Sequence, residues 1–143
     1  MVLNRENTIR RILENTKTIA VVGLSSDPSR AGYYVPAYLQ AHGYRIIPVN
    51  PFLDQALGEQ AFPDLESVPV PVDLVLIFRR SKAVLPFVQS AIEIGAKAVW
   101  MQLGIINEEA AALAREAGLD VVMDRCPMTE IPRLGIAGPR GGE

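Results

Sequence analysis

Short apolar runs alternate along the chain with segments whose apolar residues recur at helical spacing. The apolar runs lie at 18–23, 44–49, 73–78, 98–101 and 120–123. Runs of this length, rich in β-branched residues, are typical of strands buried on both faces of a sheet. The intervening segments end near Gly43, Gly95 and Gly118, and glycine commonly follows the last residue of a helix. Strands alternating with helices predict an α/β domain: a doubly wound, parallel, five-stranded sheet with helices on both faces.

The remaining segments add to this single predicted domain, 1–143, without dividing it. An apolar stripe in residues 1–17 predicts an additional helix that packs outside the sheet. Residues 52–72 are rich in proline, so we expect a loop there with at most one helical turn, at 64–67. Residues 135–143 contain four glycines and are expected to fray.

Composition narrows the class of protein. The chain has 143 residues, 49% of them hydrophobic, which is enough for one domain with a sizeable core. Lys and Arg number 14 against 16 Asp and Glu, and this balance disfavours nucleic acid as a partner. One Cys and one His cannot form an internal disulfide or a usual transition-metal site. No apolar run approaches the roughly 20 residues of a membrane span, so we expect a cytoplasmic protein without a membrane partner.

The loops that follow the predicted strands carry most of the candidate chemistry. Ligands of doubly wound sheets bind beyond the carboxyl ends of the strands. Four arginines lie in such loops: Arg30, Arg79, Arg80 and Arg125. Because the chain as a whole is acidic, arginines gathered at one edge indicate a polyanionic ligand.

The loop after the first strand is a candidate phosphate site. Gly23 permits close backbone approach, and Ser25 and Ser26 offer hydroxyl groups before a helix N-terminus with unpaired N–H groups. The alternative is an ordinary tight turn, because the loop lacks the G-x-G-x-x-G pattern of dinucleotide sites. Asp27 is expected to cap the helix that Pro28 begins.

The second strand bears on the choice of nucleotide. It ends at Asn50-Pro51, with no carboxylate. NAD sites usually place an acid there to bind the adenine ribose. The sequence therefore disfavours an ordinary NAD site, and Pro48 to Pro51 also predicts a rigid turn.

A set of motifs distributed over roughly residues 18–134 points to one family. They are Gly23-Leu-Ser25 with Pro28 and Arg30, Gly43-Tyr44 through Pro48-Val-Asn-Pro51, Val72 through Phe78-Arg79, Gln102-Leu-Gly104 and Asp124-Arg-Cys-Pro127. Together they resemble the small CoA-binding proteins with a Rossmann-like fold. The same domain type forms the CoA-binding part of the succinyl-CoA synthetase α subunit.

This resemblance implies a site for coenzyme A, or an acyl-CoA, across the loops after the first three strands. The resemblance places four residues of the first loop near phosphate: Gly23, Ser25, Ser26 and Arg30. It places Asn50 and Pro51 beside the nucleotide. It places Phe78, Arg79 and Arg80 near the pantetheine arm or the 3′-phosphate. Gln102 belongs to the same implied site. The synthetases also use a phosphorylated histidine in a later domain. This chain has only His42, which we interpret as a cation near a helix C-terminus.

An enzymatic role is the weaker interpretation. Cys126 follows a strand beside Arg125 and could be a nucleophile, but a lone Cys is more often a small buried hydrophobic residue. Asp124 and Glu130 are candidate acids with no partner evident in the sequence. Three functions stay open: non-catalytic binding of CoA or acyl-CoA, an NAD(P)-linked oxidoreductase or redox sensor, and an interaction subunit with a vestigial nucleotide site. Protein partners and oligomeric state are left open as well.

Overall fold

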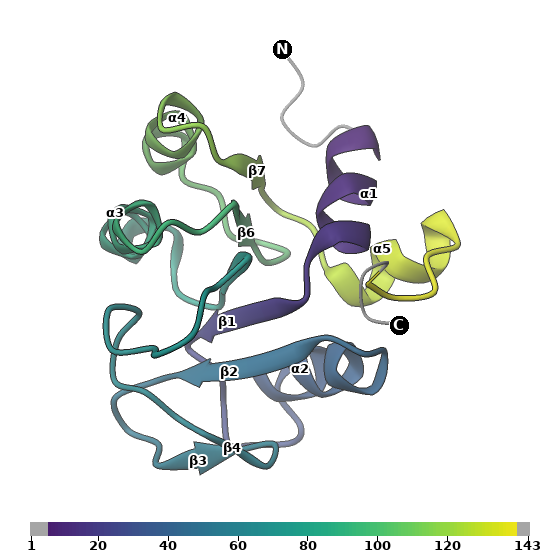
Figure 1. Ribbon diagram of the computed structural model, residues 1–143, viewed down its shortest axis with the longest axis vertical. Helices are drawn as coiled ribbons and strands as arrows, with labels where there is room; N and C mark the ends of the chain where they lie inside the picture. The colour runs from purple at the N-terminus through teal and green to yellow at the C-terminus, as the bar shows by residue number, and fades with distance from the viewer. Residues whose placement is uncertain (1–5, 140–143) are drawn as a thin grey trace.

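The computed structural model describes residues 6–139. Five parallel strands form one sheet in the order β2-β1-β5-β6-β7 (Figure 1). Their bounds are β1 Thr18–Val22, β2 Arg45–Val49, β5 Leu74–Ile77, β6 Ala98–Met101 and β7 Asp120–Val122. Each coincides with a predicted apolar run, and the parallel order confirms the doubly wound, Rossmann-like α/β fold.

Helices cover both faces of this sheet. Their bounds are α1 Glu6–Asn15, α2 Ala31–Ala41, α3 Leu85–Glu93, α4 Glu108–Glu116 and α5 Pro127–Leu134. α3 and α4 pack on one face, and α1, α2 and α5 on the other (Figure 1). Successive strand residues point to opposite faces. Trp100 is accordingly buried on the α1, α2 and α5 side, whereas Met101 is buried on the α3 and α4 side.

The N-terminal helix α1 contributes one apolar face to the core. Its apolar residues Ile9, Ile12 and Leu13 are all buried, and the helix contacts β7 and α5. The predicted helix is therefore present, and its apolar stripe completes the helical layer on one face of the sheet. Residues 1–5 of the predicted segment lie outside the described residues.

A small hairpin interrupts the segment that was expected to be loop. Its strands are β3 (Gln55–Ala56) and β4 (Glu59–Gln60), which pair in antiparallel fashion. Two-residue strands leave no periodic pattern in a sequence, so this element could not be predicted. At 64–67 the chain forms a turn, not a helical turn, in which the Asp64 carboxylate accepts the N–H of Ser67 at 2.9 Å.

α5 is the second element that was not predicted. Pro127 occupies its first turn and Pro132 lies inside it, and proline inside a helix normally argues against one.

The chain beyond α5 does not fray at once, contrary to expectation. Ile136 is 6% exposed and packs against the core. Residues 140–143 of the predicted tail lie outside the described residues.

Three helix ends carry residues that suit their positions, and the helix end predicted near Gly43 is confirmed. The Asn107 side chain caps α4, its Oδ1 accepting the N–H of Ala110 at 2.9 Å. Pro86 lies in the first turn of α3. Gly43 follows the C-cap of α2 with φ +99°, a left-handed conformation that suits glycine.

Within residues 6–139, no helix has the length and apolar character that a membrane span requires.

Tyr44 ties the chain entering β2 to α1. Its side chain is 2% exposed, and its hydroxyl donates a hydrogen bond to the Leu13 carbonyl. Burial, with smaller effects of Glu14 and Tyr38, raises the pKa of Tyr44 to about 12. The folded pKa therefore lies above the ordinary value of about 10. The neutral phenol stabilises the fold fully below about pH 10, and this contribution is lost as the pH rises toward about 12.

A Tyr44→Phe variant is expected to lose about 1 kcal/mol of unfolding free energy near neutral pH, because the Leu13 carbonyl loses its partner. Its stability should also fall less steeply than that of the native protein between about pH 10 and 12. Urea denaturation at a series of pH values measures both effects. Tyr34→Phe, at an exposed position, is the matched control. A Tyr44→Phe protein with native stability and a native alkaline slope would contradict this role of the hydroxyl.

Candidate functional site

The strand order of the sheet reverses at β1. The chain forms β2 on one side of β1 and then crosses to β5 on the other, and ligands of doubly wound sheets bind at such a switch point. The hydrogen-bond ladder continues one residue beyond the strands. Gly23 N–H donates to the Val49 carbonyl and Phe78 N–H to the Val22 carbonyl, each at 2.9 Å. The loops after β1, β2 and β5 therefore start level with one another.

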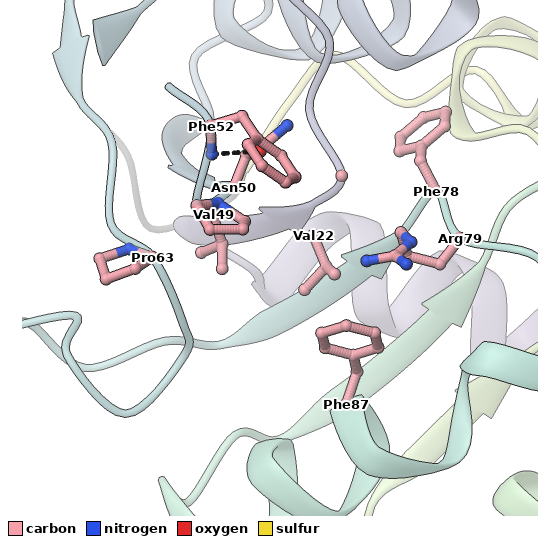
Figure 2. A pocket seen from close by; sticks show the side chains of 10 residues that line it. Val22, Val49, Asn50, Phe52, Pro63, Phe78, Arg79 and Phe87 are labelled. Atoms are coloured by element: carbon pink, nitrogen blue, oxygen red, sulfur yellow. Dashed lines mark hydrogen bonds between the residues drawn. The ribbon is translucent and has the colours of Figure 1, made fainter. Parts of the chain in front are cut away.

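A cavity of about 360 Å³ lies at this point (Figure 2). Its walls come from the ends of β1, β2 and β5, from α3 and from the segment before β5: Val22, Gly23, Val49, Asn50, Pro51, Phe52, Pro63, Phe78, Arg79 and Phe87. Among the described residues of this lining, Arg79 alone is ionisable, so the charge that they offer to a ligand is positive. The volume is at the lower end for ligand pockets and suits one part of a cofactor.

The cavity brings together half of the predicted site residues. Those that line it are Gly23, Asn50, Pro51, Phe78 and Arg79. Those that do not are Ser25, Ser26, Arg30, Arg80 and Gln102. The loop after β1 therefore contributes Gly23 to the walls but not its later residues, and Gln102 after β6 is not part of the lining.

Gly23 is required by the close approach of two backbones. Its φ is +83°, and a Cβ at this position would lie 2.7 Å from the carbonyl oxygen of Phe78. A residue with a side chain would be strained at this φ and would also collide with the Phe78 carbonyl oxygen, so the backbone would have to shift to accept it. The backbones that follow β1 and β5 consequently lie close together in the cavity lining, with no side chain at Gly23 between them.

Asn50 holds two loops together. Its Nδ2 donates to the Leu24 carbonyl and its Oδ1 accepts the N–H of Phe52, each at 2.9 Å. The carboxamide thereby joins the loop after β1 to the turn after β2, as Figure 2 shows for Phe52. Each end of the amide keeps one further hydrogen-bonding position, so Asn50 both shapes the wall and can still meet a ligand.

The loop after β1 is organised by its own side chains. Ser25 Oγ accepts the N–H of Asp27, and Asp27 Oδ1 accepts the N–H and the hydroxyl of Ser29. The backbone bond from Ser29, followed by its hydroxyl, lowers the pKa of Asp27. The prediction that Asp27 caps the helix is wrong, because α2 begins at Ala31 with Arg30 as its N-cap. Asp27 instead closes the turn before the helix.

Unpaired N–H groups lie at the end of this loop. Within the described part of the chain, the backbone N–H groups of Ser26, Ala31 and Gly32 have no hydrogen-bond partner. The first turn of α2 packs back on the loop, since a Cβ on Gly32 would lie 3.3 Å from the Gly23 carbonyl oxygen. The positive end of the helix dipole therefore faces the neighbourhood of the cavity.

The arginines at the carboxyl edge of the sheet lie in different places. Arg79 lines the cavity, with its guanidinium carbon 5.4 Å from the centre of the Phe87 ring, a cation–π arrangement. Arg80 lines a separate depression with Lys82 and Ala83, as expected for consecutive residues after a strand. Arg30 is exposed at the start of α2. The arginines were predicted to gather at one site, but of Arg30, Arg79 and Arg80 the cavity lining includes Arg79 alone.

Five lining residues were not among the predicted site residues. Two of them, Val22 and Val49, are the last residues of β1 and β2. The other three are Phe52, which stands at the rim and is 91% exposed, and Pro63 and Phe87, which complete the walls. Phe52 directly follows the predicted Asn50-Pro51 pair, so its position was a usable signal. Pro63 and Phe87 reach the cavity only through tertiary packing. An exposed aromatic ring at the mouth of a cavity offers a flat apolar face to a ligand.

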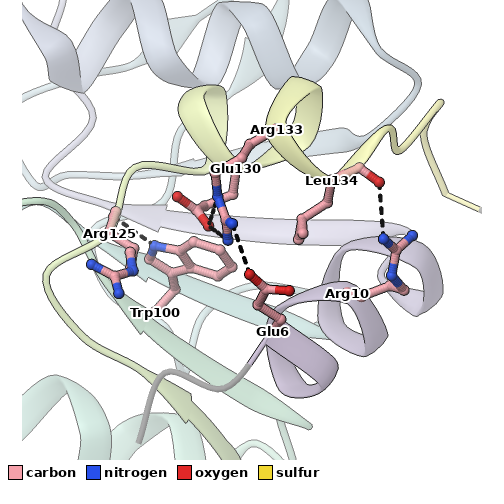
Figure 3. Close-up of polar contacts among 7 residues, drawn as sticks. All are labelled: Glu6, Arg10, Trp100, Arg125, Glu130, Arg133 and Leu134. Atoms are coloured by element: carbon pink, nitrogen blue, oxygen red, sulfur yellow. Dashed lines mark hydrogen bonds and ion pairs between the residues drawn. The ribbon is translucent and has the colours of Figure 1, made fainter.

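The candidate acids are engaged elsewhere. Glu130 is buried in α5 and accepts two hydrogen bonds from Arg133, which also pairs with Glu6 at 2.9 Å (Figure 3). The hydrogen bond from Arg133 lowers the pKa of Glu6. Asp124 Oδ1 accepts the N–H of Gly104 at 2.7 Å. These carboxylates join α5 to α1 and the β7 loop to the β6 loop.

Cys126 and His42 are also engaged in contacts outside the cavity lining. Cys126 is half-buried just before α5 and packs against the core. His42 ends α2, where its Nδ1 lies 2.8 Å from the Tyr38 carbonyl oxygen and its ring stacks on Tyr38. In the described residues, no group of three or more His, Cys, Asp or Glu is placed to hold a metal ion.

Comparison with known proteins places this geometry in context. Residues 17–132 match a protein-family model described as a CoA binding domain. YneT of Bacillus subtilis is 43% identical over 118 residues, which cover 82% of this chain and 87% of YneT. The solved structure of a hypothetical protein from Pyrococcus horikoshii OT3 has a TM-score of 0.87 and 41% identity, covering 91% of this chain and 92% of that one.

A longer relative matches part of the chain. The alpha subunit of the ADP-forming acetate–CoA ligase II of Pyrococcus furiosus is 36% identical over 86 residues. The matched region is 59% of this chain but only 18% of that subunit. The likeness is therefore confined to less than a fifth of the ligase subunit.

Proposed function

The chain belongs to the CoA-binding domain family, and from this premise we propose that it binds coenzyme A or an acyl-CoA at the carboxyl edge of its sheet. The observation that carries the proposal is the cavity at the switch point between β1 and β5, where Arg79 is the one ionisable residue among the described residues of the lining. A nucleotide bearing several phosphates matches a site of this charge and position.

The residues of this edge fit coenzyme A. The bare backbone at Gly23 allows phosphate to approach, and the free N–H groups of Ser26 and Gly32 can donate to it. Phe52 offers a ring face beside the cavity, and Arg79 can form a bidentate contact with a phosphate. Ser25 and Arg30, which flank the cavity, are proposed to meet the phosphates from the loop side.

We further propose that binding is not coupled to catalysis in this chain. None of the described residues that line the cavity has a nucleophilic or acid–base side chain. Glu130 and Asp124 are already paired with Arg133 and Gly104. A carrier, a sensor or a subunit of a larger assembly is consistent with such a site.

Mass spectrometry of gently purified native protein tests the proposal. We expect the mass of the folded chain to include coenzyme A or an acyl-CoA, released on denaturation. Recovery of NADP from the folded protein would instead favour an NAD(P)-linked role. Recovery of no nucleotide, together with no uptake of added CoA, would favour an interaction subunit with a vestigial site.

A Ser25→Asp variant is expected to bind CoA about tenfold more weakly, because a carboxylate would stand in the loop proposed to receive phosphate. Ser25→Asn is the matched control, since it can accept the N–H of Asp27 as Ser25 does without adding charge. Calorimetric titration measures both affinities, and circular dichroism checks the fold. Equal affinities for the two variants would move the phosphates away from this loop.

A further inference from the structure

The side-chain carbonyl oxygen of Gln102 is buried without a hydrogen-bond partner in the described part of the chain. The residue is 6% exposed, and its Oε1 has no partner within the described part of the chain. A buried carbonyl oxygen left unpaired is costly to a fold, and most such atoms are paired in native proteins. An unpaired acceptor at the carboxyl edge of the sheet is a candidate position for a donor from a bound ligand.

Gln102 lies one strand beyond the cavity. It directly follows β6, and its N–H donates to the Ile77 carbonyl at 3.3 Å, which places it next to the end of β5. Phe78, the first residue after β5, lines the cavity. Because Ile77 pairs with Met101 and side chains alternate along a strand, Phe78 and Gln102 belong to the same face of the sheet.

The cavity leaves part of coenzyme A to be accommodated elsewhere. With about 360 Å³ between β1, β2 and β5, it suits the nucleotide end. The pantetheine arm then has to leave over the edge of the sheet, and passing Phe78 it would reach β6. An extended arm carrying secondary amides brings N–H donors to that place, whereas the phosphates bring only acceptors.

We propose that Gln102 recognises an amide of the pantetheine arm, its Oε1 accepting the amide N–H. This assignment rests on the proposed function, and it adds that the site distinguishes coenzyme A from nucleotides that lack the arm. The carboxamide of Gln102 has a donor as well as an acceptor, so it can also meet the amide carbonyl. Recognition of the arm is thereby separated from recognition of the phosphates by Arg79.

Gln102→Leu distinguishes this role from a structural one, because the two roles predict changes of opposite sign. Leucine has a similar size and removes the unpaired buried acceptor, so the melting temperature should be at least that of the native protein. CoA affinity should nevertheless fall, by about five- to thirtyfold, as one buried hydrogen bond is lost. Gln89→Leu, at an exposed position on α3, is the matched control and should change neither quantity.

The experiment compares CoA with adenosine 3′,5′-bisphosphate, which has no pantetheine arm, by calorimetric titration of the native protein and both variants. The proposal expects Gln102→Leu to weaken CoA alone. Unchanged CoA affinity, or equal weakening of both ligands, would overturn it. If the native protein binds neither ligand, the proposed function itself fails; if it binds both and only the Gln102 effect is missing, the proposed function stands.

A measurement on the native protein keeps the test independent of the variant's folding. In nitrogen–proton correlation spectra, CoA should shift the side-chain amide signal of Gln102, and adenosine 3′,5′-bisphosphate should leave it in place. The signal of Gln89 should move with neither ligand. A Gln102 signal that responds equally to both ligands would contradict recognition of the arm.

Discussion

A Gly23→Ala variant is expected to lose about 2–4 kcal/mol of unfolding free energy and to bind CoA more than tenfold more weakly. The new methyl group would meet the Phe78 carbonyl oxygen at 2.7 Å, and alanine would have to hold a φ of +83°. Relief of the contact has to separate the ends of β1 and β5, which form the floor of the cavity. Stability and binding should therefore fall together. Urea denaturation and calorimetric titration measure the two losses.

Gly95→Ala separates the two causes. Gly95 has a φ of +78° but no atom within 4 Å of its missing Cβ, so alanine there carries only the conformational cost, about 1–2 kcal/mol. It should leave CoA affinity unchanged. If Gly23→Ala is no less stable than Gly95→Ala and binds CoA normally, the close approach of the β1 and β5 backbones has no role in the site.

Arg79→Ala is expected to weaken CoA by about ten- to a hundredfold, the loss of one charge-assisted contact. We assign that contact to the 3′-phosphate, which dephospho-CoA lacks. The native protein should therefore prefer CoA to dephospho-CoA by a similar factor, and Arg79→Ala should remove the preference. Arg80→Ala is the matched control, because Arg80 lines a different depression. Titration of both ligands against the three proteins provides the comparison.

Two outcomes would contradict the assignment to Arg79. Equal binding of CoA and dephospho-CoA by the native protein would show that the 3′-phosphate is not recognised. A larger loss for Arg80→Ala than for Arg79→Ala would place the phosphate over η1 (Ser81–Ala83), outside the cavity. Arginine is the residue to test here because its planar group binds phosphate through two hydrogen bonds, which lysine cannot reproduce.

The sheet and the edge that carries the site could be predicted from the sequence, because both depend on local pattern. Buried strands such as Leu74–Ile77 read as uninterrupted apolar runs, and parallel strands bring the residues after them to one edge. Gly23 and Arg79 were predicted for this reason, and both line the cavity. α5 was missed because Pro132 lies inside it.

The rest of the site depends on side-chain direction and tertiary packing, which sequence position does not specify. Arg30 and Arg79 both follow strands, but the path of the loop after β1 keeps Arg30 out of the cavity lining. Asn50 follows β2 as predicted, yet its bonds to Leu24 and Phe52 arise only when two loops meet. Phe87 lines the cavity because α3 packs it against the core cluster that contains Ile77, the last residue of β5.

Calorimetric titration of the native protein with CoA and, separately, with NADPH tests the central claim most directly. Binding of one CoA per chain, tighter than binding of NADPH, is the result expected from a cavity with one arginine and no carboxylate after β2. The absence of saturable CoA binding, or tighter binding of NADPH, would contradict the assignment of this edge to coenzyme A.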